Sequence, residues 1–402
     1  MKKVLQINTV AGFGSTGRIA DNIGEQAKQQ NWESFLAYGR KEGKSTSQLF
    51  KIENKLGNFY HLVMTRLTDK HGLGSTNATK KFIKYIQDLN PDIIHLHNIH
   101  GYYLNYKLLF DFLNNLDTPL VWTLHDCWSF TGHCSYFDFV ECGKWKEECN
   151  QCPQLHSYPK SYVDNSLSNY QLKKKLFSEH PNLTIVPVSN WLGDLVSESF
   201  LGKHRKKIIH NGVDTDSFKP KKINVSVQKK YNLNNKFIIL GVASIWEKRK
   251  GLDDFITLSK MISEHEVIVL VGLNSTQLKE LPNNIIGISR TDSINELAEL
   301  YSTAGVFFNP TYEDNFPTTN LESLSCGTPV ITYNTGGSPE AISSDSGFTV
   351  AKGDLSHMLE CVSTIQKLGK AYFSDNCRKR VIHNFEMKNQ FLKYIDLYNS
   401  LI

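Results

Sequence analysis

The sequence predicts two successive α/β domains, each a doubly wound, Rossmann-like parallel sheet with helices on both faces. Short apolar, β-branched runs alternate with amphipathic helical patterns along the chain. The chain has 402 residues, more than the roughly 300 at which a single hydrophobic core stops growing. The alternation begins again after a polar, lysine-rich stretch at 214–235. Continuous apolar strands separated by helices are typical of parallel sheets, because helices cover both faces.

Both halves of the chain supply a similar set of strand candidates. In the first half they are 4–8, 34–38, 92–98, 120–125 and 183–189. In the second half they are 237–243, 267–272, 285–288, 306–310 and 329–334. A helical pattern at 78–90 places Phe82, Ile83, Ile86 and Leu89 on one face, as an amphipathic helix between two strands requires.

The polar stretch at 214–235 marks the boundary between the two domains. We therefore expect a first domain at 1–210 and a second domain at 211–375. The last segment, 376–402, is interpreted as one helix that crosses back to the first domain and is long enough to pack across both.

The composition is that of an ordinary soluble protein, with 21% charged residues and a formal net charge of +5. This mild basic excess does not indicate nucleic-acid binding, but it suits anionic ligands or a membrane surface. The start, MKKVLQINTV, has no signal-peptide pattern, and no run approaches the ~18 apolar residues of a spanning helix. We expect a cytoplasmic protein. KKK at 173–175 and KHRKK at 203–207 are either peripheral contacts with the inner face of the cytoplasmic membrane or solvated surface.

Glycines at 12, 14 and 17 spell G-x-G-x-x-G after the first strand, which is the fingerprint of dinucleotide binding. That fingerprint places its first glycine at the strand end and an acidic residue about 20 residues further on. Here Thr9, Val10 and Ala11 intervene, and the second strand ends at Tyr38-Gly39-Arg40 without a carboxylate. An NADP-dependent oxidoreductase stays an alternative, because Arg40 is suited to a 2′-phosphate.

We instead expect a glycine-rich turn in which Gly14 and Ser15 contact the phosphate or sugar of a ligand, with Thr16 on the acceptor side. Ser15 or Thr16 is expected to cap a helix that begins near Arg18. The N–H groups of such a helix start attract anions. A turn that is merely tight is the structural alternative.

Several spaced segments resemble the retaining GT-B glycosyltransferases of glycosyltransferase family 4. In the second half these are IIHNGVDTDSFKP at 208–220, WEKRKGLDDF at 246–255 and YEDNFPTTNLESLSCGTPVITYNTGGSPE at 312–340. In the first half, HLHNIHG at 95–101 and TLHDCWSFTGHC at 123–134 look like that family's capsule, O-antigen and colanic-acid branch. The resemblance implies two Rossmann-like domains that face each other across a cleft. The first would be the acceptor side, and the second would bind a nucleotide sugar.

The family's donor site carries an acidic residue, seven others and then a glutamate, and Asp314 and Glu322 have that spacing. Glu313 lies one residue earlier, so either acid could contact the donor sugar, although the spacing favours Asp314. The resemblance implies that this acid and the loop Asn315-Phe316-Pro317 hold the sugar, while Glu322 holds the nucleotide ribose. Thr318-Thr319 open a helix whose N-terminus suits the diphosphate. A capped helix with two solvated acids is the alternative.

Arg249 and Lys250, within EKRKG, supply positive charge for a departing nucleoside diphosphate, whose charge grows in the transition state. The family often has a further arginine after the strand, where this chain has Ser244. Lys248 or Arg249 is therefore expected to share that arginine's role. A basic helix start on the surface is the alternative, although cations at a helix N-terminus oppose the helix dipole unless an anion binds there.

His125 ends a strand within TLHD, and the resemblance implies that it touches the donor sugar near the reacting carbon, with Asp126 orienting its ring. His125 and Asp314 are therefore the expected catalytic residues, meeting when the two domains close. His97 and His100 are expected on the acceptor side. With His95 they also suggest a metal site, which the alternation of side chains along a strand disfavours. Core or solvated histidines are the alternative.

Four cysteines, Cys134, Cys142, Cys149 and Cys152, lie in one loop at 127–152, and Cys127 is a substitute ligand. A cytoplasmic chain does not keep disulfides, so this set indicates a structural zinc knuckle, with loosely packed thiols as the alternative. Catalysis itself is expected to need no metal. The D-x-D sequence at 214–216 lies in the family's interdomain signature, and we interpret it as structural.

The resemblance implies a retaining hexosyltransferase of cell-surface polysaccharide biosynthesis, such as that of capsule or O-antigen. The enzyme is expected to move a sugar from a UDP- or GDP-sugar to a carbohydrate acceptor, a lipid-linked glycan, without a nucleic-acid partner. A non-catalytic sugar-nucleotide-binding protein is the second alternative, beside the NADP-dependent oxidoreductase.

Overall fold

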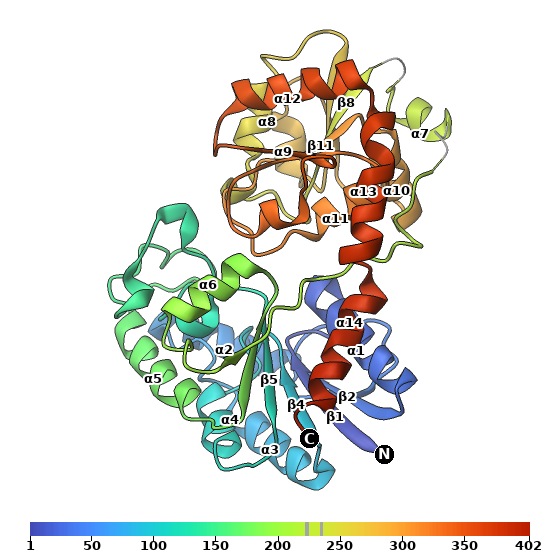
Figure 1. The fold of residues 1–402 in the computed structure, drawn as a ribbon. Coiled ribbons are helices and arrows are strands. Elements are labelled where there is room, and N and C mark those ends of the chain that lie inside the picture. Colours follow the sequence, from blue (N-terminus) through green and yellow to red (C-terminus); the bar gives the residue numbers. More distant parts are fainter. Residues whose placement is uncertain (222–224, 234–235) are drawn as a thin grey trace. The chain divides into compact units, whose positions relative to one another are not determined.

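The computed structural model describes residues 1–221, 225–233 and 236–402, which Figure 1 shows as two compact units. The first unit combines Met1–His210 with Phe391–Ile402, and the second is Asn211–Gln390. Each unit contains a parallel sheet with helices packed on it. Within the expected boundary stretch, residues 222–224 and 234–235 lie outside the described residues.

In the described part of the chain, the first sheet has seven strands in the order β3-β2-β1-β4-β5-β6-β7, all parallel. Their bounds are β1 (Lys2–Asn8), β2 (Trp32–Tyr38), β3 (Gln48–Lys51), β4 (Ile93–Leu96), β5 (Leu120–Leu124), β6 (Leu183–Pro187) and β7 (Arg205–Lys206). The helices are α1 (Gly14–Gln29), α2 (Lys55–Thr68), α3 (Thr76–Leu89), α4 (Tyr106–Leu113), α5 (Ser166–Ser178) and α6 (Asn190–Glu198). The predicted strands are confirmed, but the prediction misses β3 and β7, which are short and carry exposed polar residues.

The second sheet has six strands among the described residues, in the order β10-β9-β8-β11-β12-β13, again all parallel. Their bounds are β8 (Phe237–Val242), β9 (Glu266–Val271), β10 (Ile285–Ile288), β11 (Val306–Asn309), β12 (Val330–Tyr333) and β13 (Gly347–Val350). The helices are α7 (Val225–Lys230), α8 (Leu252–Leu258), α9 (Ser275–Glu280), α10 (Ile294–Thr303), α11 (Thr318–Ser325), α12 (Leu355–Leu368) and α13 (Lys370–Asn384). The prediction misses only the short edge strand β13 of these described strands.

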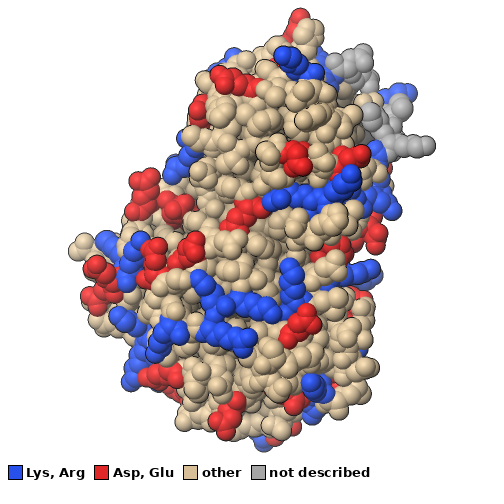
Figure 2. All heavy atoms as spheres, in the orientation of Figure 1, with Lys and Arg blue, Asp and Glu red and all other residues tan. Residues whose placement is uncertain are grey.

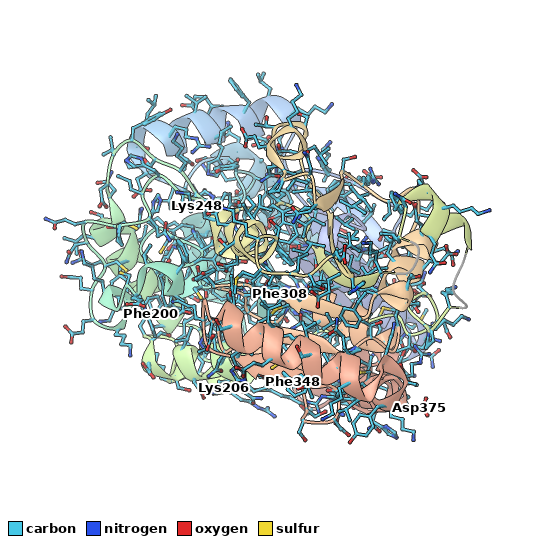
Figure 3. All side chains as sticks on the ribbon, turned by 90° about the horizontal axis from the view of Figure 1, so that it is seen from above. Phe200, Lys206, Lys248, Phe308, Phe348 and Asp375 are labelled. Carbon is cyan, nitrogen blue, oxygen red and sulfur yellow. The ribbon has the colours of Figure 1, made fainter. Side chains whose placement is uncertain are left out.

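The central strands of both sheets are buried on both faces. Every residue of β4, β5 and β11 is buried, and the ring of Phe308 in β11 (labelled in Figure 3) packs against those of Phe255 and Tyr333. A strand with two buried faces needs apolar residues at nearly every position, because helices cover each face. This burial explains why the strands are visible in the sequence as continuous apolar runs.

Each sheet reverses its strand order beside the first strand of its unit. β1 lies between β2 and β4, and β8 lies between β9 and β11. Open α/β sheets bind ligands outside the carboxyl ends of the strands at such a switch point. The loops after these strands are therefore the places to look for the functional residues of each unit.

The single helix predicted at 376–402 is wrong. The structure has α13 (Lys370–Asn384) followed by α14 (Met387–Asn399), both drawn in red in Figure 1. Between them, Val213 N donates to Phe385 O (3.0 Å) and Met387 N donates to Val213 O (3.1 Å). These two bonds to a distant residue replace the helical bonds at this point, so the helix ends and restarts.

Basic side chains gather over part of the first unit on the face drawn in Figure 2, with acidic side chains elsewhere on it. One expected basic patch is wrong in part, because Lys173 of the KKK sequence is only 1% exposed. Its ammonium group donates to Trp128 O (2.7 Å) and Thr131 O (3.1 Å), and burial lowers its pKa to about 7. Lys173 is therefore a structural lysine inside the unit.

The last helix is tied to the first sheet through His95. Tyr398 OH donates to His95 Nδ1 (2.6 Å), His95 Nε2 donates to Thr123 Oγ1 (2.8 Å), and Thr123 Oγ1 donates to Tyr394 OH (3.2 Å). Burial lowers the pKa of His95 well below its usual range. A neutral ring suits this chain of bonds, since one nitrogen accepts and the other donates.

We predict that Tyr398→Phe lowers the free energy of unfolding by about 1–3 kcal/mol, because a buried acceptor on His95 loses its donor. Thermal and denaturant unfolding of the full chain measure the change. Tyr372→Phe, at a side chain that is 61% exposed, is the matched control and should leave the transition where it is. An unchanged transition in Tyr398→Phe would contradict the role of this bond.

Candidate functional site

The glycine-rich loop after β1 has two kinds of glycine. Gly12 (φ +56°) packs against a second loop, where an added Cβ would come within 2.0 Å of Lys44 O. The two loops also share backbone bonds, from Ala11 N to Lys41 O (3.1 Å) and from Gly43 N to Ala11 O (2.7 Å). By contrast, a Cβ added to Gly14 (φ +65°) would point into open space, more than 4 Å from any part of the described structure beyond its own helix and chain neighbours. Gly12 thus serves loop packing, whereas the space beside Gly14 is open.

The predicted start of the first helix is wrong. α1 begins at Gly14, and its N-cap is Phe13, for which the described residues provide no side-chain cap. Ser15 and Thr16 lie inside the first turn, and Asn8 Nδ2 donates to Thr16 Oγ1 (3.4 Å). The positive φ of Gly14 lets the chain turn directly from the extended Phe13 into the helix, so neither hydroxyl reaches the cap position. An uncapped helix N-terminus still attracts anions.

A chain of hydrogen bonds connects the interior of the first sheet to its carboxyl edge. Gln6 Nε2 donates to Ala20 O (2.7 Å), so Gln6 Oε1 is the atom that accepts from His97 Nε2 (3.0 Å). His97 Nδ1 then accepts from His125 Nε2 (3.1 Å). Burial lowers the pKa of His97 well below its usual range and that of His125 to about 4. Both rings are therefore neutral, and the Gln6 amide sets the direction of both bonds.

His100 and Asp126 form a second group at the same edge. His100 Nε2 lies 2.9 Å from Asp126 Oδ2, and His100 Nδ1 lies 2.9 Å from Tyr158 OH. Trp128 N donates to Asp126 Oδ1 (2.9 Å). Burial alone would raise the pKa of Asp126, but His100 and these hydrogen bonds hold it below its usual value. The structure thus pairs Asp126 with His100, and it is His97 that binds the ring of His125.

The loops after β1 and β4 are joined, which brings the first unit's candidates to one edge. Thr9 Oγ1 lies 3.0 Å from Asn98 O and 2.6 Å from His100 O. Sequence reasoning missed three residues of this region: Gln6, His71 and Tyr158. The ring of His71 lies 5.9 Å from that of His100 and 5.7 Å from that of Tyr158. A polar residue inside the apolar run VLQIN was the signal for Gln6, whereas His71 and Tyr158 come from segments without a motif.

The second unit brings its expected cations and acids together. The short segment Lys248–Lys250 follows β8 (Lys248 is labelled in Figure 3), and the loop at 310–317 follows β11. Lys250 and Asp314 form an ion pair, and Arg249 Nη1 donates to Glu313 O (3.0 Å). Tyr312 N donates to Arg249 O (2.7 Å). The two segments are therefore fixed against each other at the switch point.

The two neighbouring acids differ in burial. Glu313 is fully buried, while the side chain of Asp314 keeps 18% of its surface exposed and that of Lys250 keeps 21%. The loop's shape depends on Gly336 (φ +56°), since an added Cβ would lie 2.0 Å from Asp314 O. Gly337 N donates to that same oxygen (3.0 Å). The geometry favours Asp314 over Glu313 as the acid that meets a ligand.

α11 carries the remaining donor candidates. Pro317 is its N-cap, Thr318 and Thr319 lie in its first turn, and Tyr301 OH donates to Glu322 Oε2 (3.0 Å). Asn315 and Phe316 are buried, and the ring of Phe316 packs against that of Phe385 (5.5 Å between centroids). The side chain of Phe316 thus packs into the core of the second unit.

The D-x-D sequence forms a turn. Asp214 Oδ1 accepts from Asp216 N (2.9 Å) and Ser217 N (3.2 Å), and Ser217 Oγ donates to Asp214 Oδ2 (2.6 Å). Arg378 then donates to Thr215 O (2.9 Å) and Phe218 O (2.7 Å). These bonds support the structural interpretation of this sequence.

The four loop cysteines surround a small cavity. All four line a space of about 10 Å³, and Cys134 and Cys152 are hydrogen-bonded. The bond from Cys134 lowers the pKa of Cys152 to about 7, whereas burial raises that of Cys149 to about 11. Within the described ranges, no three His, Cys, Asp or Glu side chains are already arranged to hold a metal ion, so a zinc site here would need the thiols to move closer together. The zinc knuckle stays a prediction.

Comparison with known proteins places most of the chain in two families of domain. Residues 17–217, half of the chain, match the model described as Glycosyltransferase Family 4. Residues 236–367 match the model described as Glycosyl transferases group 1. WcaC of Escherichia coli K12, named for colanic acid biosynthesis, is 25% identical over 99% of this chain and 100% of its own length. CapM of Staphylococcus aureus, named for capsular polysaccharide biosynthesis, is 25% identical over 54% of this chain and 62% of its own.

Solved GT-B structures share the fold over the full length. Sucrose-phosphate synthase from Thermosynechococcus elongatus covers 100% of this chain and 99% of its own, with a TM-score of 0.71 and 16% identity. HepE from Anabaena, solved with UDP-glucose, covers 100% of both chains with a TM-score of 0.68 and 14% identity. At such identities the likeness concerns the fold, and the family follows from the matched half of the chain: this protein belongs to glycosyltransferase family 4 and has the GT-B fold.

Proposed function

We propose that this glycosyltransferase of polysaccharide biosynthesis moves a hexose from a UDP- or GDP-sugar to a lipid-linked glycan, with retention at the anomeric carbon. The cluster of Arg249, Lys250 and Asp314 at the switch point of the second sheet carries the proposal. The names of WcaC and CapM, and the UDP-glucose of the HepE structure, support the donor and the pathway.

The cluster suits a sugar diphosphate. Arg249 and Lys250 would balance the negative charge that the leaving diphosphate gains, and we propose that they replace a divalent metal at the donor. The N-terminus of α11 at Thr318 and Thr319 would add N–H groups, and Glu322 would take the ribose. Asp314, now paired with Lys250, would exchange that partner for hydroxyl groups of the sugar.

In the first unit, we assign His125 to the donor sugar, and we propose that Gly14 and Ser15, in the glycine-rich loop, also bind the donor. His97 would then be a positioning residue, because it holds the ring of His125 in one tautomer. Thr16 and His100 remain the acceptor-side candidates, whereas the expected acceptor contact of His97 gives way to this positioning role, because its ring is buried with both nitrogens bonded. The oxidoreductase alternative loses its main observation, since loop packing accounts for Gly12 of the glycine motif.

We predict that Arg249→Ala combined with Lys250→Ala weakens nucleoside-diphosphate binding by roughly tenfold or more, about 1.4 kcal/mol, through lost charge-assisted contacts. Isothermal calorimetry measures the affinity. The double variant Lys260→Ala/Lys279→Ala removes the same charge from exposed positions of the second unit and should bind as the parent does. Equal nucleoside-diphosphate affinity in both double variants would contradict the assignment of Arg249 and Lys250 to the donor diphosphate.

We predict that His125→Ala reduces turnover by roughly a hundredfold while nucleotide affinity stays within about twofold, because His125 would touch the sugar and not the diphosphate. Asp314→Asn should instead weaken discrimination between donor sugars. Steady-state rates with saturating donor and acceptor measure the first effect. Full turnover in His125→Ala would place the reaction centre elsewhere, and the absence of turnover in the parent would favour a non-catalytic binder.

We predict one zinc ion per chain in fresh, reduced protein, held by the loop thiols around their small cavity. Elemental analysis measures it. Cys149→Ser/Cys152→Ser should lose the metal, and Cys361→Ser, a buried cysteine of the second unit, should keep it. The absence of zinc from the fresh, reduced protein would contradict the prediction of a zinc knuckle. Transfer activity that depends on added Mg²⁺ or Mn²⁺ would contradict the proposal that catalysis needs no metal.

A further inference from the structure

The fully buried positions of α2 are polar, its exposed face carries large apolar residues, and Leu62 and Met64 are half-buried. Its buried residues are His61 and Thr65. Its exposed face carries five large apolar side chains at helical spacing, with these exposed fractions: Leu56 77%, Phe59 62%, Tyr60 69%, Val63 37% and Leu67 60%. A helix on the surface of a globular protein normally turns its apolar stripe toward the core. This helix does the opposite.

The orientation of α2 is fixed by specific bonds. His61 Nε2 accepts from Gly72 N (3.1 Å) and Gly74 N (3.2 Å), and its Nδ1 lies 3.0 Å from Ser75 Oγ. Burial lowers the pKa of His61 to about 4, which keeps the ring neutral and able to accept. The helix start is held as well, because Asn54 Oδ1 accepts from Gly57 N (2.9 Å). Rotating the helix so that its apolar face turned inward would break these bonds. The fold therefore holds this apolar face exposed.

The surroundings of this face are basic. Residues 53–89 contain six lysines and arginines and three acids, a net charge of +3. Of the acids, Asp69 is buried against His133, and Glu53 and Asp88 lie near the two ends of the segment. Five of the six are exposed lysines, two next to the ends of α2 and three on α3: Lys55, Lys70, Lys80, Lys81 and Lys84. A protein partner would need a matching acidic rim, whereas an anionic bilayer supplies both an apolar layer and negative headgroups. Aromatic side chains such as Phe59 and Tyr60 also suit the boundary between them.

A cavity opens beside the same face. It has a volume of about 730 Å³ and is lined by Tyr60 and Met64 of α2, by the cations Lys51 and Lys81, and by one acid, Glu53. That size suits a bound small molecule or headgroup. None of the helices in the described ranges has both the length and the apolar composition that crossing a bilayer requires.

We propose that α2 lies in the boundary layer of an anionic membrane, with its exposed apolar face among the acyl chains and the neighbouring lysines on the headgroups. This inference rests on the proposed lipid-linked acceptor. The cavity beside Tyr60 then lies where the polar head of such a lipid arrives from the membrane. The expected basic contacts at 173–175 and 203–207 are not needed for this docking.

The test is co-sedimentation of the full chain with vesicles of phosphatidylcholine mixed with phosphatidylglycerol. We expect binding that falls when phosphatidylglycerol is left out or salt is raised. Phe59→Gln/Val63→Gln/Leu67→Gln should weaken binding about tenfold or more, with an unchanged melting transition because these side chains are exposed. The matched control is Ile294→Gln/Leu368→Gln/Ile382→Gln, which removes exposed apolar side chains from helices of the second unit and should bind as the parent does.

Two results would overturn the proposal: a parent chain that does not bind the vesicles, or a triple α2 variant that binds them as the parent does. A third outcome would assign the face to a second copy of the chain. In it, the parent does not bind vesicles and forms dimers in analytical ultracentrifugation, and the triple α2 variant is a monomer. Nucleoside-diphosphate affinity is measured on the same proteins. A parent chain that binds no nucleoside diphosphate would count against the proposed function, but it would not change the conclusion from the vesicle experiment.

Discussion

A parallel sheet with helices on both faces offers no water to the polar side chains of its strands, and this constraint organises the first unit. Gln6, His95, His97 and Thr123 are all buried in central strands or at their ends. Because an unpaired buried polar group is costly, each takes its partners from a neighbouring strand or helix. The bonds are linked, since Gln6 sets the proton position of His97 and His97 sets that of His125. The sheet thus delivers a histidine of defined tautomer to its carboxyl edge.

The second unit meets the same constraint with charge. Lys250 and Asp314 neutralise each other, with only about one-fifth of each side chain exposed. Partly buried charges need partners, so a ligand that takes one of them must also satisfy the other. A sugar diphosphate has both parts, a phosphate for the lysine and hydroxyl groups for the carboxylate. The ion pair and the bond from Arg249 to Glu313 keep the loop in shape without a ligand, and a preformed loop lowers the ordering cost of binding one.

The sequence predicts what depends on local pattern and misses what depends on distant segments. Strands buried on both faces are visible as apolar runs, and motif spacing finds Lys250 and Asp314, although their roles remain predictions. The break in the last helix needs Val213, which lies over 170 residues earlier in the chain. The burial of Lys173 needs carbonyl groups from another loop. Tyr158 joins the first unit's edge only through folding, because no pattern links it to the histidines.

The return of the chain to the first unit has a consequence for biosynthesis. Tyr394 and Tyr398 are fully buried there, although their partners Thr123 and His95 lie 271 and 303 residues earlier. The ribosome releases the chain from its N-terminus, so the whole of 211–390 emerges before these tyrosines do. While the second unit is being synthesised, the part of the first unit's core that Tyr394 and Tyr398 later cover is therefore exposed. The part of the protein that is made first is the part that is completed last.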